Sequence, residues 1–252
     1  ARSVGLWKNQ TCTLFLKKSV SEYSLGTASG AAHCTASHVE TTLSADEATS
    51  SMVIDVTSST GMTAADDIGI ILDDGTIDWT TIDSVDSSTK ITITTGLTSA
   101  ATTGNRVYTY TTKINRPLNI VEMRHRAAGS DGTDIPIDLI SRQEYMFLSN
   151  KTNTGVTTQA FYDPQTSLSK LFLWPVPANS DETIRMTVKA PIEDFDADSD
   201  EADYPQEWFV ALKFSLAAQI GHEYNVKLDK LNHIIQLAQY ELELVSGFDE
   251  EP

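Results

Sequence analysis

The stretch "KITITTGLTSAATTGNRVYTYTT" (residues 90–112) decides the fold class, because it holds two short alternating runs separated by turn residues. Ile91 and Ile93 alternate with threonines in the first run, and Val107 and Thr109 alternate with tyrosines in the second. Side chains that alternate in this way lie on opposite faces of a β-strand, so each face meets a different environment. The stretch therefore predicts two strands of a β-sheet.

The same texture extends upstream, where residues 50–112 contain almost no Lys or Arg and repeat short β-type runs at intervals of about ten residues. Further strands are predicted in "MVIDVTS" from Met52, "IGIILDD" from Ile68 and "DWTTIDSV" from Asp78. The Asp-Gly pair in "DDGT" (73–76) predicts a tight hairpin between the last two of these runs. We interpret residues 50–112 as an inserted small all-β module, either a sandwich or a barrel.

The chain on either side of this module has longer β-type runs with larger apolar residues. After Lys113 these are "LNIVEMRHR", "IPIDLISRQEYMFL", "TTQAFYDP", "KLFLWPVP" and "TIRMTVKAPI". The earlier run "TCTLFLKKSVSEYSLG" (11–26) also predicts a strand and a turn. We expect residues 11–26 and 114–193 to form one β-rich body, so that the core of the protein comprises residues 1–49 and 113–252.

From about residue 205 the apolar periodicity becomes helical. In "PQEWFVALKFSLAAQIGHEYN" one face carries Trp208, Ala211, Leu212, Leu216 and Ile220. Gly221 and Asn225 are expected to mark the end of this helix. A second helix has apolar residues at steps of three and four, namely Leu228, Leu231, Ile235, Ala238, Leu242 and Val245. Two helices with a short connection predict an antiparallel hairpin, and hence an α+β fold. The second helix either forms an intramolecular core or also contacts a neighbouring subunit.

The acidic stretch "DFDADSDEADYPQEW" (194–208) resembles a calcium loop in its spacing. Carboxylates at the first, third, fifth and twelfth loop positions would be Asp196, Asp198, Asp200 and Glu207. However, Glu201 occupies the position of the required glycine, and Pro205 interrupts the segment. We therefore favour a solvated loop in which Asp203 caps the following helix, and these four carboxylates stay weak metal candidates.

No other arrangement of residues in the sequence carries a recognisable chemistry. His33, Cys34 and His38 lie close together, but no second pair completes a tetrahedral metal site. Cys12 and Cys34 are the only cysteines, and we expect them to be reduced, structural thiols. The sequence has neither a nucleophile elbow nor the lysine of a phosphate-binding loop. We expect no cofactor and no enzymatic activity.

The charge of the chain limits its partners. Asp and Glu number 35 against 18 Lys and Arg, which gives a formal net charge of -17. Charge-driven binding to nucleic acid is excluded by this balance, although an acidic surface suits a passage through which DNA slides. No run of eighteen or so apolar residues is present, so we expect no contact with a membrane.

The order of several segments resembles a known family. These segments are "GLWKNQTCTLFLKKSVSEYSLG", "TKINRPLNIVEMRHR", "ISRQEYMFLSNK", "FYDPQTSLSKLFLWPVP" and "KAPIEDFDADSDEADYPQEWFVALKFSLAAQIGHEY". Together they resemble the head-to-tail adaptor proteins of short-tailed bacteriophages, also called tail accessory factors or packaged-DNA stabilisation proteins. The resemblance runs along nearly the whole chain. It implies a further helix ahead of "GLW"; because the sequence starts at Ala1 without a Met, we expect this helix either to be absent or to lie outside the given sequence.

The resemblance implies a structural protein of the virion neck and tail, assembled in the bacterial host cytoplasm. Such proteins form a homo-oligomeric ring, usually of twelve copies, beneath the portal protein. The ring encloses DNA without reading its sequence, helps to retain the packaged genome, and provides a platform for the tail nozzle protein and for tail fibres. The helices and the C-terminal tail would engage the portal or a neighbouring subunit through Trp208, Leu212, Leu228, Leu231, Ile235, Leu242 and Phe248.

Two other classes of protein remain as alternatives. One is a tail-associated peptidoglycan hydrolase, which would need a pair of carboxylates in different environments. The other is a calcium-dependent binding module, which would use the acidic stretch described above.

Overall fold

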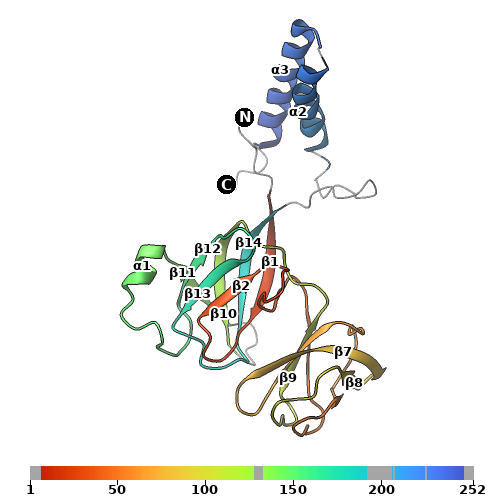
Figure 1. Cartoon of the computed structure of the whole chain (residues 1–252), viewed down its shortest axis with the longest axis vertical. Coiled ribbons are helices and arrows are strands. Elements are labelled where there is room, and N and C mark those ends of the chain that lie inside the picture. Colours follow the sequence, from red (N-terminus) through yellow and green to blue (C-terminus); the bar gives the residue numbers. More distant parts are fainter. Residues whose placement is uncertain (1–6, 128–132, 192–205, 207, 225, 247–252) are drawn as a thin grey trace. The chain divides into compact units, whose positions relative to one another are not determined.

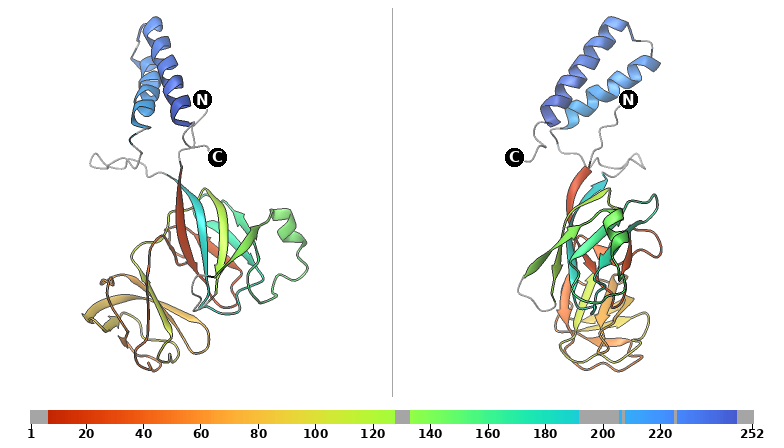
Figure 2. Two further views of the ribbon diagram at one scale, coloured as in Figure 1. Left: turned by 180° about the vertical axis from the view of Figure 1, so that it is seen from behind. Right: turned by 90° about the vertical axis from the view of Figure 1, so that its left-hand side faces the viewer.

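The structure is a computed structural model that describes residues 7–127, 133–191, 206, 208–224 and 226–246. The chain divides into two compact units, Ala1–Pro191 and Ile192–Pro252. The first unit contains two curled β-sheets and the second contains a pair of helices (Figures 1 and 2). This β-rich architecture with a C-terminal helical pair confirms the expected α+β class.

The first sheet joins strands from the two ends of the first unit. Its order is β2 (Glu22–Leu25), β13 (Ser169–Trp174), β12 (Gln159–Asp163), β11 (Asp134–Leu139), β10 (Asn119–Arg126), β14 (Thr183–Pro191), β1 (Trp7–Phe15) and β3 (Cys34–Thr35). Neighbouring strands are antiparallel except β11 and β12, which are parallel. The longest continuous register pairs β1 with β14, from Trp7 opposite Pro191 to Phe15 opposite Thr183.

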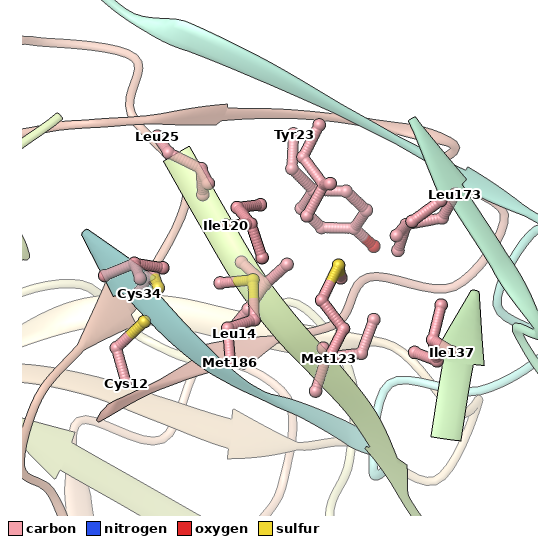
Figure 3. Close-up of a cluster of buried hydrophobic side chains, with 14 of the residues drawn as sticks. Cys12, Leu14, Tyr23, Leu25, Cys34, Ile120, Met123, Ile137, Leu173 and Met186 are labelled. Carbon is pink, nitrogen blue, oxygen red and sulfur yellow. The ribbon is translucent and has the colours of Figure 1, made fainter. Parts of the chain in front are cut away.

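Alternation along these strands places one apolar row in a shared core. Cys12 and Leu14 of β1 are buried together with Met186 of β14 and Met123 of β10 (Figure 3). Cys34 of β3 lies in the same core, and its sulfur atom faces that of Cys12. Both thiols are free and buried, and burial followed by the interaction with Cys12 raises the pKa of Cys34.

The second sheet lies within the first unit and is built from residues 39–110. Its order is β4 (Val39–Thr42), β9 (Arg106–Tyr110), β6 (Asp67–Ile71), β7 (Ile77–Ser87), β8 (Lys90–Ile93) and β5 (Val53–Asp55). Backbone hydrogen bonds also join its two edges, since Ser44 N donates to Asp55 O (2.9 Å) and Thr57 N donates to Thr42 O (2.8 Å). The sheet encloses its own apolar core, which includes Ile54, Ile68, Ile82, Ile91, Ile93 and Val107.

The strands predicted between residues 50 and 112 are confirmed as β5 to β9. The Asp-Gly turn is confirmed too, because Gly75 has a φ of 78° and its N–H donates to Leu72 O. Strand β4 was missed, since its four residues are partly exposed and show no alternation. The second sheet thus begins at Val39, ahead of the expected module boundary, and that boundary stays a prediction.

One predicted β run is wrong in its second half. Strand β11 ends at Leu139, and α1 (Arg142–Phe147) follows it. The helix begins with a capping box: Ser141 Oγ accepts from Glu144 N, and the Glu144 carboxylate accepts from Ser141 N at 2.7 Å. The Ser-x-x-Glu spacing that forms this box was present in the sequence. These capping hydrogen bonds favour a helix here, although the apolar run suggested a strand.

Aromatic side chains connect the two sheets of the first unit. Phe15 at the end of β1 contacts three rings of the second sheet, with centroids 5.2 Å from Trp79, 4.8 Å from Tyr108 and 6.1 Å from Tyr110. His33 stacks on Trp79 at 3.7 Å, and its Nδ1 lies 2.6 Å from the Tyr110 hydroxyl. These rings, called the aromatic cluster below, bury apolar area that neither sheet covers alone.

Gly69 of β6 makes room for this cluster. A Cβ atom at Gly69 would lie 2.7 Å from Cζ2 of Trp79, and a rigid indole ring held between neighbours cannot yield cheaply. We expect Gly69→Ala to lower the free energy of unfolding by about 1–3 kcal/mol, measured by urea denaturation with tryptophan fluorescence. Gly155→Ala is the control, because its new Cβ would meet Pro175 at an ordinary 3.7 Å. Equal stability of the two variants would contradict the packing.

His33 should make the first unit sensitive to mild acid. Burial, followed by the charges of Lys113 and Lys17, lowers the pKa of His33 from 6.5 to about 3. Below pH 6.5, His33 is therefore protonated in the unfolded chain but stays neutral in the folded chain. The free energy of unfolding is thus highest above pH 6.5 and decreases as the pH falls toward 3. We expect the melting temperature to fall between pH 6.5 and 5, before the carboxyl groups titrate.

A His33→Gln variant provides the comparison for this pH effect. The melting temperature of this variant should fall less between pH 6.5 and 5 than that of the wild type. The fall that remains would come from His38, whose pKa is also lowered mainly by burial. Melting temperatures of the two proteins would then converge as the pH falls. Parallel curves would show that His33 does not carry the effect.

Candidate functional site: the helical pair

Two antiparallel helices, α2 (Trp208–Glu223) and α3 (Leu228–Ser246), form the described part of the second unit (Figure 2). Their connection is short: Val226 N donates to Gly221 O at 3.2 Å, and Leu231 N donates to Lys227 O at 3.0 Å. The predicted helical pair is confirmed. The expected cap at Asp203 lies outside the described residues, so the start of α2 is described from Trp208 only.

Gly221 has a different role from the one expected. It lies inside α2 and is buried, and the helix continues to Glu223. A Cβ atom at this position would lie 2.6 Å from Cδ1 of Leu231. The glycine therefore allows α3 to approach closely, and Leu231 fills the space that its missing side chain leaves. Asn225, the other expected helix end, lies outside the described residues.

The predicted interface residues divide by their exposure. Leu231 is 2% exposed and belongs to the interior of the pair, whereas Leu228, one turn earlier on α3, is 69% exposed. The others that the structure describes are half-buried, namely Trp208, Leu212, Ile235 and Leu242. Phe248 lies outside the described residues, as do the metal candidates Asp196, Asp198, Asp200 and Glu207. Their proposed roles stay predictions.

The pair also exposes large apolar side chains: Leu216 belongs to the apolar face expected from the sequence, whereas Phe209, Tyr240 and Leu244 were not singled out there. On α2, Phe209 is 65% exposed and Leu216, seven residues later, is 58% exposed. On α3 the exposed apolar residues include Tyr240 and Leu244. Because α2 carries apolar residues around most of its circumference, one neighbouring helix cannot cover them all. A periodicity search finds such a helix but does not tell which side faces α3.

The charge of the pair differs from that of the whole chain. Its described residues carry three lysines (Lys213, Lys227 and Lys230) against four acidic residues (Glu223, Asp229, Glu241 and Glu243). The described helices are thus nearly neutral, although the chain has a formal charge of -17. Two copies of this surface can approach one another with little electrostatic repulsion.

Other functional signals were searched for in the part of the chain that the structure describes. His, Cys, Asp and Glu side chains form no group of three there that could hold a metal ion. No helix in that part of the chain is both long enough and apolar enough to cross a membrane. Comparisons with protein-family models, with curated proteins and with solved structures find no match to this chain.

Leu231 and Leu228 offer a matched test of the helical pair. Leu231→Ala removes a buried side chain and should destabilise the pair by about 2–4 kcal/mol, lowering the thermal midpoint of helical circular dichroism. Leu228→Ala removes the same atoms from an exposed position and should change stability by less than about 0.5 kcal/mol. Similar losses in both variants would mean that Leu228 is also covered.

Proposed function

We propose that this chain is a structural virion protein, a head-to-tail adaptor that forms a ring beneath the portal of a short-tailed bacteriophage. In this role it extends the DNA channel, helps to retain the packaged genome and provides a platform for the tail nozzle protein. The proposal rests on the collinear segments described above and on a β-rich unit followed by a helical pair.

The exposed apolar side chains of the helices are the observation that carries the proposal. Phe209 and Leu216 on α2, with Tyr240 and Leu244 on α3, are half or more exposed, and large exposed apolar side chains that gather on one unit are typical of an interaction surface. In a ring bound to a portal, neighbouring helices would cover these side chains. The near-neutral charge of the described helices favours such contact between equivalent surfaces.

The acidic surface fits passage of DNA in the same proposal. Acidic side chains that face the channel would repel the phosphates, so DNA would pass without sticking. The expected β module of residues 50–112, whose strands belong to the second sheet, would lie on the outside of the ring. There it would contact tail fibres or a neighbouring subunit. Ring assembly would take place in the host cytoplasm, usually with twelve copies.

Electron microscopy of the chain mixed with the portal protein of its own phage tests the proposal. We expect rings of this protein seated on the portal. Leu216→Glu should reduce the fraction of portals that carry a ring at least about tenfold, because it places a charge in an apolar contact. Gln219→Glu adds the same charge at another exposed position of α2 and should have a smaller effect.

Two results would contradict the proposal. Portals that stay bare at saturating concentrations of the wild-type chain would exclude a portal-bound adaptor. Rings that form equally well with Leu216→Glu would show that this face of α2 is not the contact. Circular dichroism of both variants should match the wild type, so a loss of rings would not reflect unfolding.

A further inference from the structure

A polar pocket of about 290 Å³ lies at one end of the second sheet. Its lining includes His38, which directly precedes β4, and Thr109 and Tyr110 at the end of β9. Asp66, which directly precedes β6, lines it as well. The volume is several times the roughly 30 Å³ that one water molecule occupies, so the pocket has room for a small organic group.

Asp66 supplies a buried carboxylate that is only partly used. The residue is 2% exposed, and its Oδ2 accepts from Thr63 N at 2.8 Å. The other oxygen, Oδ1, is buried and has no hydrogen-bond partner among the residues that the structure describes. The backbone around it is fixed to β7, since Ala65 N donates to Ile82 O and Ile82 N donates to Asp66 O. The carboxylate is therefore held in place without being satisfied.

Thr109 supplies a second unused polar atom on the same pocket. It is 1% exposed, and its Oγ1 has no hydrogen-bond partner. Its position is fixed from both sides, because β9 pairs Thr109 with Val39 of β4 and with Ile68 of β6. Alternation puts Thr109 on the same side as Val107, which belongs to the apolar core. A valine would fit this place, so the hydroxyl group needs another explanation.

The other residues that line the pocket indicate which charge a ligand of Asp66 and Thr109 would carry. No Lys or Arg lines the pocket, so nothing in the lining neutralises the Asp66 carboxylate. The Tyr110 hydroxyl is already engaged at 2.6 Å by His33 Nδ1, and alternation puts the Tyr110 ring on the opposite face of β9 from Thr109, in the aromatic cluster. Burial lowers the pKa of His38, so this side chain is neutral near pH 7. A carboxylate and a hydroxyl without partners suit a cation that donates hydrogen bonds.

We propose that this pocket binds a primary ammonium group on an alkyl chain. The ammonium donates one hydrogen bond to Asp66 Oδ1 and a second to Thr109 Oγ1. Guanidinium is less suitable, because its planar fork pairs with both oxygens of a carboxylate at once and Asp66 Oδ2 already accepts from Thr63 N. The ammonium group comes either from a free diamine or from a lysine side chain of another protein.

Isothermal titration of the full chain with 1,5-diaminopentane tests the proposal, with Nα-acetyl-lysine methylamide as a second probe. We expect the diamine to bind and 1-pentanol, the neutral analogue, not to bind at the same concentrations. Binding of the lysine derivative as well would identify a lysine side chain as a fitting source, and binding of the diamine alone would identify a free amine. Equal binding of 1-pentanol would overturn the proposal.

Three variants locate the binding at the pocket. Asp66→Asn keeps the acceptor for Thr63 N and removes the charge, so the diamine affinity should fall at least about tenfold. Asp83→Asn removes an exposed carboxylate from β7 of the same sheet and should leave the affinity unchanged. If both variants weaken binding equally, the diamine senses only the general acidity of the chain and the proposal is wrong.

Thr109→Val provides a test that does not depend on Asp66. It removes the unused hydroxyl and keeps the shape, so we expect a thermal midpoint equal to or above that of the wild type, together with a several-fold weaker diamine affinity. A lower midpoint with unchanged affinity would mean that the hydroxyl group serves the fold through buried water. That result would overturn its role in binding.

Discussion

The pairing of β1 with β14 is the constraint on which the rest of the first unit depends. Residues near the start and the end of this unit run side by side from Trp7 opposite Pro191 to Phe15 opposite Thr183. Everything between them must leave this pair and return to it, so the second sheet forms as an excursion between β3 and β10. Phe15 ends β1 and also contacts the aromatic cluster, so the same strand positions both sheets. Such non-local pairing implies slow folding, because distant segments must meet first.

Closure of the second sheet explains why its interior is aliphatic in the middle and holds polar side chains at one end. Hydrogen bonds join both edges, so the interior fills with aliphatic side chains such as Ile68, Ile82 and Val107. At one end, alternation along β9 places Thr109 on the core side. The turn before β6 places Asp66 in the lining of the same pocket. Buried polar atoms are normally hydrogen-bonded, so the unpaired atoms of these two residues are an exception in this sheet. Such exceptions are expected where a protein binds a ligand.

Local patterns in the sequence were sufficient for most elements and insufficient for what depends on distant partners. Alternation found β5 to β9, and the Asp-Gly pair found the turn at Gly75. The capping box of α1 was equally local and was overlooked, because the apolar run around it favoured a strand. Helical spacing placed Leu228 and Leu231 on the same apolar face, although only Leu231 is buried. The pocket could not be anticipated, since Asp66 and Thr109 meet only through sheet pairing.

The uneven distribution of charge bears on the proposed assembly of this chain. Most of its acidic excess lies outside the described helices, where it keeps like surfaces apart. The helices lack that protection and carry apolar residues on sides that face away from each other. Two helices bury one face each, so a helix that is apolar nearly all round needs a third neighbour. In the proposed ring, repulsion across the rest of the surface would restrict assembly to the helical pair, which would give the oligomer a defined contact without a large interface.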